Sequence, residues 1–426
     1  MIIHVVKKGD SMYSIARQYG QPMQKIIADN RLENPGRLVV GQTIVVMADQ
    51  IPHVVAQGES LYTIARSYDT TVAAILRANP GITDPAFIRA GQVVNIPVPS
   101  QQLGSMQVNG YAFPNINRNT LRSTQAFLTY LSIFSYQVRP DGSLAAIPDQ
   151  EPANAARQAQ VAPMMVITNI KEGASFNSDL AHTILTDQTV QNNLLDNIER
   201  TLKEKQYAGL DIDFEYVYPN DRENYNQFLR KVAARLRPQG YLLTTALAPK
   251  LSATQTGLLY QAHDYAVHGQ VADHVILMTY EWGYTYGPSQ AVAPIDQVER
   301  VLRYAVSVIP SEKILMGMPN YGYDWTLPFV QGSAARSISN TAAVNLAARV
   351  GAKIQYDQKS QAPYFNYYDS NRREHVVWFD DARSVEARLR LVEKYKLGGV
   401  SYWTINTYFP QNWLVLQSLY QVQKVL

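Results

Sequence analysis

Eight short apolar segments recur between residue 107 and residue 403, and helical stretches separate them. The segments are QVNGYAF near 107, FLTYLSIF near 127, APMMVITNI near 162, YAGLDIDFEY near 207, YLLTTALAP near 241, ADHVILMTY near 272, KILMGMPNY near 313 and GGVSYW near 398. Strands that alternate with helices predict a parallel sheet, and eight such units predict an α/β fold, a closed (β/α)8 barrel over residues 107–426. A doubly wound open sheet is the alternative, but no Gly-rich phosphate loop follows the first segment.

One helix and one insertion can be placed within this domain. Between the third and fourth segments, Val190, Leu194, Ile198 and Leu202 recur at the spacing of one helix face. The stretch between the seventh and eighth segments is too long for one crossover. We therefore expect residues from about 323 to 377 to form a small α+β insertion beside the barrel mouth.

The first hundred residues contain an internal repeat. HVVKKGDSMYSIARQYGQPMQKIIADN begins at His4, and HVVAQGESLYTIARSYDTTVAAILRAN begins 49 residues later, at His53. Each copy closes with a segment that starts with GQ, and we expect each to fold as strand, helix, helix, strand. We define residues 1–48 as the first module and residues 51–98 as the second module. Residues 99–106 are expected to form a linker.

Both copies resemble the LysM module over most of their length. That family binds N-acetylglucosamine-containing glycans, peptidoglycan or chitin, through the loop after its first strand and the loop before its last. The resemblance implies glycan contacts from Gly9, Asp10, Ser11 and Asn30 in the first module and from Gly58, Glu59, Ser60 and Asn79 in the second. Ser11 and Ser60 fit the alternative of a helix cap equally well. Two weak sites on one chain would raise the avidity for a polymer.

Composition narrows the classes of partner. The chain is 46% hydrophobic and 17% charged, as expected for a folded globular protein. Its net charge is only +3 and no basic run stands out, so we do not expect a nucleic-acid partner. It has no cysteine, and its N-terminal residues do not follow the pattern of a secretory signal peptide. No apolar run is long enough to predict a membrane partner.

The segment GLDIDFEYVYP, residues 209–219, places three acids in an apolar and aromatic run. Side chains alternate along a strand, so Asp211, Asp213 and Glu215 point one way while Ile212, Phe214 and Tyr216 point the other. The apolar set fits the layer that faces the helices, so the acids should point inward near the C-terminal end of the fourth barrel strand, where barrel enzymes keep their sites. Three carboxyl groups so close cannot all stay ionised, and at least one pKa should be raised, as a general acid requires. A salt-bridged cluster or a cation site is the alternative.

At this point the chain resembles the family 18 glycoside hydrolases, the chitinase-like barrels, whose fourth-strand signature is D-G-x-D-x-D-x-E. Residues 208–215 match its last three acids but have Ala208 in place of the first. The resemblance extends to MTYEW near 278, GMPNYGYDW near 317 and the GGVSYW ending at Trp403. It implies that the substrate's own 2-acetamido carbonyl attacks the sugar, giving an oxazolinium ion and net retention, without metal or organic cofactor.

The resemblance also implies roles for single residues. Glu215 would be the general acid and then the base. Asp213 would orient the acetamido nitrogen, Asp211 would tune Asp213, and Tyr280 would donate a hydrogen bond to the acetamido carbonyl. Further substrate-binding candidates are Trp403 as the floor of the sugar site, Tyr111, Met278, Glu281, Trp282, Asn320 and Trp325. For the aromatic candidates Tyr280, Trp403, Tyr111, Trp282 and Trp325, packing in the core is the alternative.

Three departures from the family pattern stand out. The first signature acid is replaced by Ala208, and the Asp of the sixth-strand M-x-Y-D pattern is replaced by the longer Glu281. The third-strand pattern S-x-G-G is absent, and Thr168 and Asn169 stand in its place. Contacts that typical members make from that strand therefore cannot be carried over.

The order of two LysM-like modules and a barrel is similar to that of the spore cortex-lytic N-acetylglucosaminidases. This likeness implies a monomeric hydrolase of cortex peptidoglycan, located in the spore coat or cortex region and made without a signal peptide, or otherwise associated with the cell wall. A chitinase would use the same residues on another polymer. A lectin-like barrel is the alternative without chemistry, but it would be expected to lack the acid that Glu215 supplies.

Overall fold

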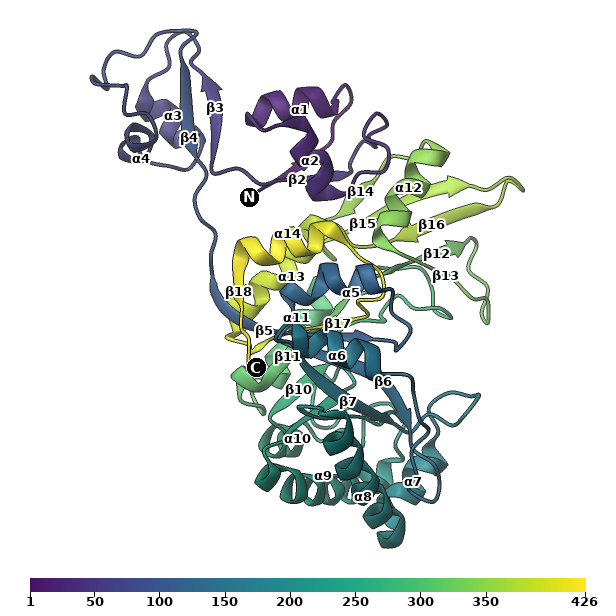
Figure 1. Cartoon of the computed structure of the whole chain (residues 1–426). Helices are drawn as coiled ribbons and strands as arrows, with labels where there is room; N and C mark the ends of the chain where they lie inside the picture. The colour runs from purple at the N-terminus through teal and green to yellow at the C-terminus, as the bar shows by residue number, and fades with distance from the viewer.

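The computed structural model describes residues 1–426, and its first part is the pair of modules (Figure 1). The first module consists of β1 (Ile2–Val5), α1 (Met12–Tyr19), α2 (Met23–Asn30) and β2 (Thr43–Val46), with β1 and β2 antiparallel. The second consists of β3 (Gln50–Val54), α3 (Leu61–Ser67), α4 (Val72–Ala78) and β4 (Val93–Pro97), with β3 and β4 antiparallel. The predicted order of strand, helix, helix, strand is confirmed in both copies.

A closed barrel of eight parallel strands follows the modules. The strands are β5 (Gly104–Ala112), β6 (Tyr130–Gln137), β7 (Ala162–Thr168), β8 (Gly209–Asp213), β9 (Leu242–Leu247), β10 (His274–Leu277), β11 (Ile314–Pro319) and β17 (Gly399–Trp403). Each pairs with the next in this order, and β17 pairs with β5 to close the sheet. Each strand overlaps one predicted apolar segment, so the barrel is confirmed and the open sheet is excluded.

Helices surround the barrel. They are α5 (Arg118–Thr124), α6 (Gln150–Gln158), α7 (Ser178–Thr186), α8 (Gln188–Lys205), α9 (Arg222–Leu236), α10 (Tyr265–Val271), α11 (Ile295–Ala305), α13 (Ala382–Tyr395) and α14 (Pro410–Leu419). Short 3-10 turns span Gln125–Phe127, Pro219–Asp221, Arg237–Gln239 and Ser311–Lys313, and β18 (Tyr420–Val422) adds to the start of β5. The predicted helix is α8, and Val190, Leu194, Ile198 and Leu202 are all buried on it.

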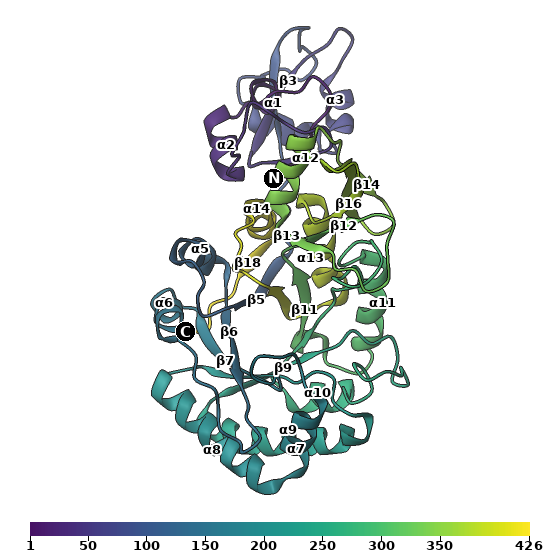
Figure 2. The same cartoon turned by 90° about the vertical axis from the view of Figure 1, so that its right-hand side faces the viewer.

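The predicted α+β insertion lies between β11 and β17. It contains β12 (Gly322–Thr326), β13 (Arg336–Ile338), α12 (Asn340–Val350), β14 (Gln355–Asp357), β15 (Ala362–Tyr368) and β16 (Glu374–Trp378). The strands form one antiparallel sheet in the order β13-β12-β16-β15-β14. Figure 2 shows this insertion on the side of the barrel that faces the modules.

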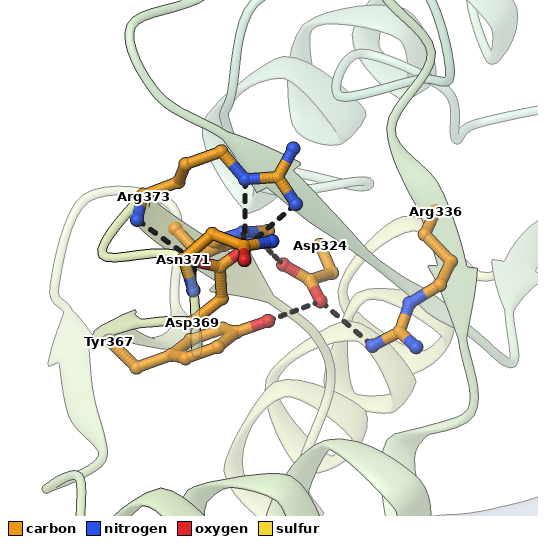
Figure 3. A network of polar contacts seen from close by, with 7 residues as sticks. Asp324, Arg336, Tyr367, Asp369, Asn371 and Arg373 are labelled. Carbon is orange, nitrogen blue, oxygen red and sulfur yellow. Dashed lines mark hydrogen bonds and ion pairs between the residues drawn. The ribbon is translucent and has the colours of Figure 1, made fainter.

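A polar network connects four strands of the insertion (Figure 3). The buried carboxylate of Asp324 on β12 accepts hydrogen bonds from Arg336, Tyr367 and the ring of His375, at 2.9 Å each. Asp369, at the tip of the β15–β16 hairpin, accepts from the backbone N–H and the guanidinium of Arg373. A buried carboxylate stabilises the fold only when all of its hydrogen-bond donors are present, because losing one leaves a buried charge uncompensated. The network therefore fixes how the hairpin lies on β12.

The first module has a small apolar core of its own, and two of its valines are in addition buried in clusters of the barrel domain. Val45 is fully buried in the main cluster between the barrel strands and their helices. Val39 is buried in the core of the insertion, with Leu346 and Phe365. The apolar cluster of the second module is built only from residues 51–98. The first module is therefore packed as part of the barrel domain.

Candidate active site

The three acids of β8 and the residues after it converge at the C-terminal end of the barrel. Asp211 and Asp213 lie on the inner face of the strand, with exposed fractions of 0% and 4%. On the opposite side, Phe214 stacks on Phe228 of α9, so the predicted division into an acidic and an apolar face holds through this residue. The strand itself ends at Asp213, and Glu215 follows it.

The predicted direction of Tyr216 is wrong. It was expected to face the helices with Ile212 and Phe214, but its ring lies on the cavity side and is 41% exposed. Its backbone has φ of 53°, in the left-handed region, so the chain turns there and the alternation of a strand no longer applies. Tyr216 therefore joins the aromatic rim of the site.

Each oxygen of the Asp211 carboxylate accepts a hydrogen bond from a neighbouring hydroxyl. Tyr111 donates to Oδ2 at 2.5 Å, and Thr244 of β9 donates to Oδ1 at 2.6 Å. Burial raises the pKa of Asp211 to about 6, although both hydrogen bonds favour the ionised form. The hydroxyl of Tyr111, a predicted substrate contact, is thus engaged by Asp211, while its ring lines the cavity.

Asp213 and Glu215 have no such partners. Oδ1 of Asp213 is buried without any hydrogen bond. Burial, then the charges of Glu215 and Asp211, hold the pKa of Asp213 well above its ordinary range. Burial, then the charge of Glu281, raises the pKa of Glu215 to about 7. An acid with this pKa can both give and take a proton at neutral pH.

These groups open into a cavity of about 720 Å³. Its lining residues are Tyr111, Phe134, Ile170, Ser175, Phe176, Asp213, Glu215, Tyr216, Ala246, Ala248, Pro249, Leu259, Tyr260, Met278, Tyr280, Glu281, Tyr284 and Trp403. No lysine, arginine or histidine is among them, so the salt-bridged alternative for the acids is excluded. A largely apolar hollow with a few converging carboxyl groups suits an uncharged sugar chain.

Tyr280 and Met278 approach the acids from the end of β10. The charges of the acids and, above all, burial keep the pKa of Tyr280 well above its ordinary value, so its hydroxyl stays a donor. The ring fits because position 317 on β11 is glycine. A Cβ there would lie 2.8 Å from Cε1 of Tyr280.

Trp403 ends β17 and stands against three other aromatic rings. Its ring centroid lies 4.8 Å from Phe134, 5.5 Å from Tyr111 and 6.0 Å from Phe113, all edge to face. These contacts hold the indole upright at the cavity wall, where one face can receive a sugar ring.

Glu281 is held at the edge of the cavity by two tyrosines. Tyr321 and Tyr323 both donate to its carboxylate, the second at 3.1 Å. The side chain reaches the surface, but its carboxyl group is packed against aromatic rings, and this desolvation raises its pKa. The longer side chain at this position is thus tied to the start of the insertion.

Three other predicted substrate contacts lie outside the cavity. Trp325 is 2% exposed, and its indole N–H donates to the carbonyl of Gly287 at 2.9 Å. Trp282 packs against the barrel core. Asn320 lines an adjoining hollow of about 260 Å³ with Trp403 and Glu281, and its amide binds the carbonyls of Thr404 and Thr407.

Several residues of the site were not predicted. Phe134, Phe176, Tyr260 and Thr244 were missed, although Phe134 stands at the end of a predicted strand, which is a usable signal. Asn169 was noted only as a departure from the family pattern, yet its amide contacts the backbone of Glu215.

In both modules the predicted glycan-binding residues make the same local bonds. Ser11 and Ser60 each cap a helix in a capping box, as the cap alternative required. Asp10 accepts from the N–H of Lys7, and Glu59 accepts from that of Ala56. The remaining positions are turn glycines and strand-bridging amides: Gly9 and Gly58 have positive φ, and Asn30 and Asn79 each bond the final strand of their module.

Two further observations concern ligands and membranes. No group of three or more His, Asp or Glu side chains has the arrangement of a metal site. None of the helices combines the length and apolar character that a membrane span needs.

The site and fold agree with comparisons to known proteins. The model of glycosyl hydrolases family 18 matches residues 110–407, and that of the LysM domain matches residues 4–46 and 53–97. The chain is 43% identical to the cortical fragment-lytic enzyme of Bacillus subtilis, over 100% of this chain and 99% of that protein.

Two solved structures are similar over the full length. The spore cortex-lytic enzyme SleL of Bacillus megaterium has a TM-score of 0.90 at 40% identity and covers 100% of this chain and 99% of its own. That of Bacillus cereus has a TM-score of 0.86 at 41% identity and covers 99% and 98%.

Proposed function

The chain belongs to glycosyl hydrolases family 18, and on that premise we propose that it hydrolyses the bond after N-acetylglucosamine in spore cortex peptidoglycan or its fragments. The observation that carries the chemistry is the convergence of Asp213 and Glu215 on one cavity without basic side chains, with Asp211 fully buried on the same strand face. The choice of polymer is supported by the full-length similarity to the cortical fragment-lytic enzyme of Bacillus subtilis.

In the proposed reaction Glu215 gives its proton to the glycosidic oxygen as the bond to the anomeric carbon breaks. The carbonyl oxygen of the substrate's 2-acetamido group forms the new bond to that carbon, which gives an oxazolinium ion. Glu215, now ionised, takes a proton from the water that opens this ring, so the anomeric configuration is retained. A pKa of about 7 suits both steps.

The neighbouring groups would hold the acetamido group in place. Asp213 has an unpartnered buried oxygen that can bind the acetamido nitrogen. Asp211 lies beneath it as a charge fixed by Tyr111 and Thr244, and the Tyr280 hydroxyl can donate to the acetamido carbonyl. Trp403, Met278 and Glu281 would contact the sugars on either side, with Asn320 in the adjoining hollow.

The two LysM domains would bind the same polymer and keep the chain on it. We propose domain limits of 1–48 and 51–98 for these domains, 99–106 for the linker and 107–426 for the barrel with its insertion near 323–377. We further propose a monomer located in the spore coat or cortex region, which sedimentation and fractionation of spores would check.

The deciding experiment offers the full chain purified cortex fragments and chitin oligomers in parallel and reads the products by mass spectrometry. New reducing ends at N-acetylglucosamine from cortex fragments are expected. Cleavage of chitin alone would replace this proposal with that of a chitinase. A glycan whose acetamido groups have been removed should not be cut, because it lacks the nucleophile.

The Glu215→Gln variant should bind the polymer and cleave it at least ~100-fold more slowly, because the amide cannot give a proton. Glu172→Gln, at an exposed position outside the cavity, is the matched control and should cleave normally. Near-normal turnover of Glu215→Gln would overturn the mechanism. Binding without cleavage by the unaltered chain would favour the lectin-like alternative.

A further inference from the structure

The backbone of Glu215 lies beyond the sheet that precedes it. β8 ends at Asp213, and the last register pair between β7 and β8 joins Thr168 to Asp213. No backbone ladder therefore holds the peptide units on either side of Glu215, although the position of its carboxyl group depends on them.

The side chain of Asn169 replaces the missing ladder. Its Oδ1 accepts the N–H of Glu215 at 2.9 Å, and its Nδ2 donates to the carbonyl of the same residue at 2.8 Å. The second hydrogen of Nδ2 goes to the carbonyl of Asn177 at 3.1 Å. Asn169 is 0% exposed, so no water competes for these bonds. Because one partner is a donor and two are acceptors, only one orientation of the amide satisfies all three.

A histidine binds the same peptide unit, Phe214–Glu215, at its carbonyl end. His263 accepts the N–H of Ala248 on Nδ1 at 3.0 Å and donates from Nε2 to the carbonyl of Phe214 at 2.9 Å. These partners require the neutral ring, and burial lowers the pKa of His263 to about 4, so it stays neutral at pH 7. On the far side, the hydroxyl of Ser178 donates to the carbonyl of Tyr216 at 2.5 Å.

We propose that Asn169 is a positioning residue for Glu215, and this inference rests on the proposed function. Its amide bonds both the N–H and the C=O of Glu215, so it restricts the rotations on both sides of that Cα and thereby the direction of the carboxyl group. An amide is required, because aspartate can accept the N–H but cannot donate to the two carbonyls. A proton donor displaced by about 1 Å loses on the order of 100-fold in rate.

The experiment uses the full chain and compares Asn169→Ala and Asn169→Asp with Asn197→Ala. Asn197 lies on the outer helix α8, where its amide donates to the carbonyls of Gly142 and Asn193, so its removal costs similar bonds away from the cavity. On cortex fragments, kcat of the Asn169 variants should fall by about 100-fold with KM within about twofold. The control should keep the kcat of the unaltered chain.

A second measurement separates positioning from a general structural role. A dinitrophenyl glycoside of an N-acetylglucosamine oligomer has a leaving group that departs without protonation. The first turnover of the Asn169 variants should therefore release dinitrophenolate at nearly the unaltered rate, while their cleavage of the natural glycan is slow. Equal losses on both substrates would overturn the proposal.

Other outcomes also decide it. Folded variants with kcat within twofold of the unaltered chain would overturn the positioning role alone, because the proposed function needs only that the unaltered chain cleaves. Failure of both variants to fold would also count against it, since the amide would then serve the fold. An unaltered chain without cleavage would overturn the proposed function itself.

Discussion

The first and second modules share one fold but have different surroundings. At the positions where the first module has Val39 and Val45, both buried against the barrel domain, the second has Arg89 and Asn95, both exposed. These positions of the two modules correspond because the backbone N–H of Val39 and that of Arg89 each donate to the side chain of the glutamine three residues later, at 3.0 Å. A small number of side chains thus separates a packed module from a free one.

Hydrogen bonds show the same contrast. In the first module, Val40 accepts from the N–H of Ile354 at 2.9 Å, and Gln411 of α14 bonds both the hydroxyl and the carbonyl of Thr43 at 2.6 Å. No hydrogen bond or ion pair joins residues 50–98 to the barrel domain. A repeat in sequence therefore need not be a repeat in role. The first module is held against α14 and the insertion, while the second makes no hydrogen bond or ion pair to the barrel domain.

The largest effect should come from two matched glycines. Gly41 and Gly91 have φ of 91° and 83°, so alanine strains both equally, but a Cβ at Gly41 would lie 1.9 Å from the carbonyl oxygen of Ile354 whereas Gly91 has open space. Gly41→Ala should lower the free energy of unfolding of the barrel by about 1–3 kcal/mol more than Gly91→Ala.

Urea unfolding followed by tryptophan fluorescence would measure this difference. All five tryptophans lie at or beyond residue 282, so the signal reports the barrel domain alone. Equal midpoints for the two variants would show that the first module is not coupled to the barrel.

A comparable effect is expected where α14 contacts β2. Gln411→Ala leaves the hydroxyl and carbonyl of Thr43 buried without a partner, which should cost about 1–3 kcal/mol. Hydrogen exchange should become faster in β1 and β2 and stay unchanged in β3 and β4. Gln417→Ala, at an exposed position of the same helix, is the control. Faster exchange in both modules would contradict the division.

A weaker contact joins the first module to the loop before α14. The guanidinium carbon of Arg31 lies 3.8 Å from the ring centroid of Tyr408, and Arg31 also donates to Ser123 at 3.0 Å. A double-mutant cycle of Arg31→Ala with Tyr408→Leu should give a coupling free energy of about 0.5–1 kcal/mol. Arg77→Ala on α4 of the second module should show no coupling to Tyr408→Leu, and a coupling of the same size there would contradict the assignment.

The least effect should be the response to acid. The N–H of Ala56, then the ring of His53, lower the pKa of Glu59, and the N–H of Lys7 chiefly lowers that of Asp10. A lowered carboxyl pKa stabilises the folded state above the unfolded value, near 4.5 for Glu and 3.8 for Asp, and this support is lost as the pH falls.

Both modules lose this electrostatic stabilisation at low pH, but only the first is also stabilised by contacts with the barrel domain. NMR spectra recorded from pH 7 down to pH 3 should therefore show the amide signals of β3 and β4 collapsing before those of β1 and β2. The Glu59→Gln variant should remove part of this dependence. Simultaneous loss in both modules would contradict the comparison.

The sequence alone determined much of this protein. The apolar segments and their spacing predicted all eight barrel strands and the helix α8, because these patterns are local and follow the geometry of each element. The insertion was predicted from the length of chain between the last two strands. The alternation of Asp211 and Asp213 with Ile212 and Phe214 placed the acids on the inner face for the same reason. The repeat likewise predicted two units of one fold.

Only the tertiary structure decided how distant parts meet. The turn at Tyr216, the amide of Asn169 on the backbone of Glu215, and the close approach of Gly41 to Ile354 join residues from separate elements. The spacing of residues along the sequence does not predict such contacts, because they depend on how the barrel closes and which surfaces it then presents. The two modules show this most simply. Their shared residues determine the fold of each unit, and packing against the barrel determines which of them is buried.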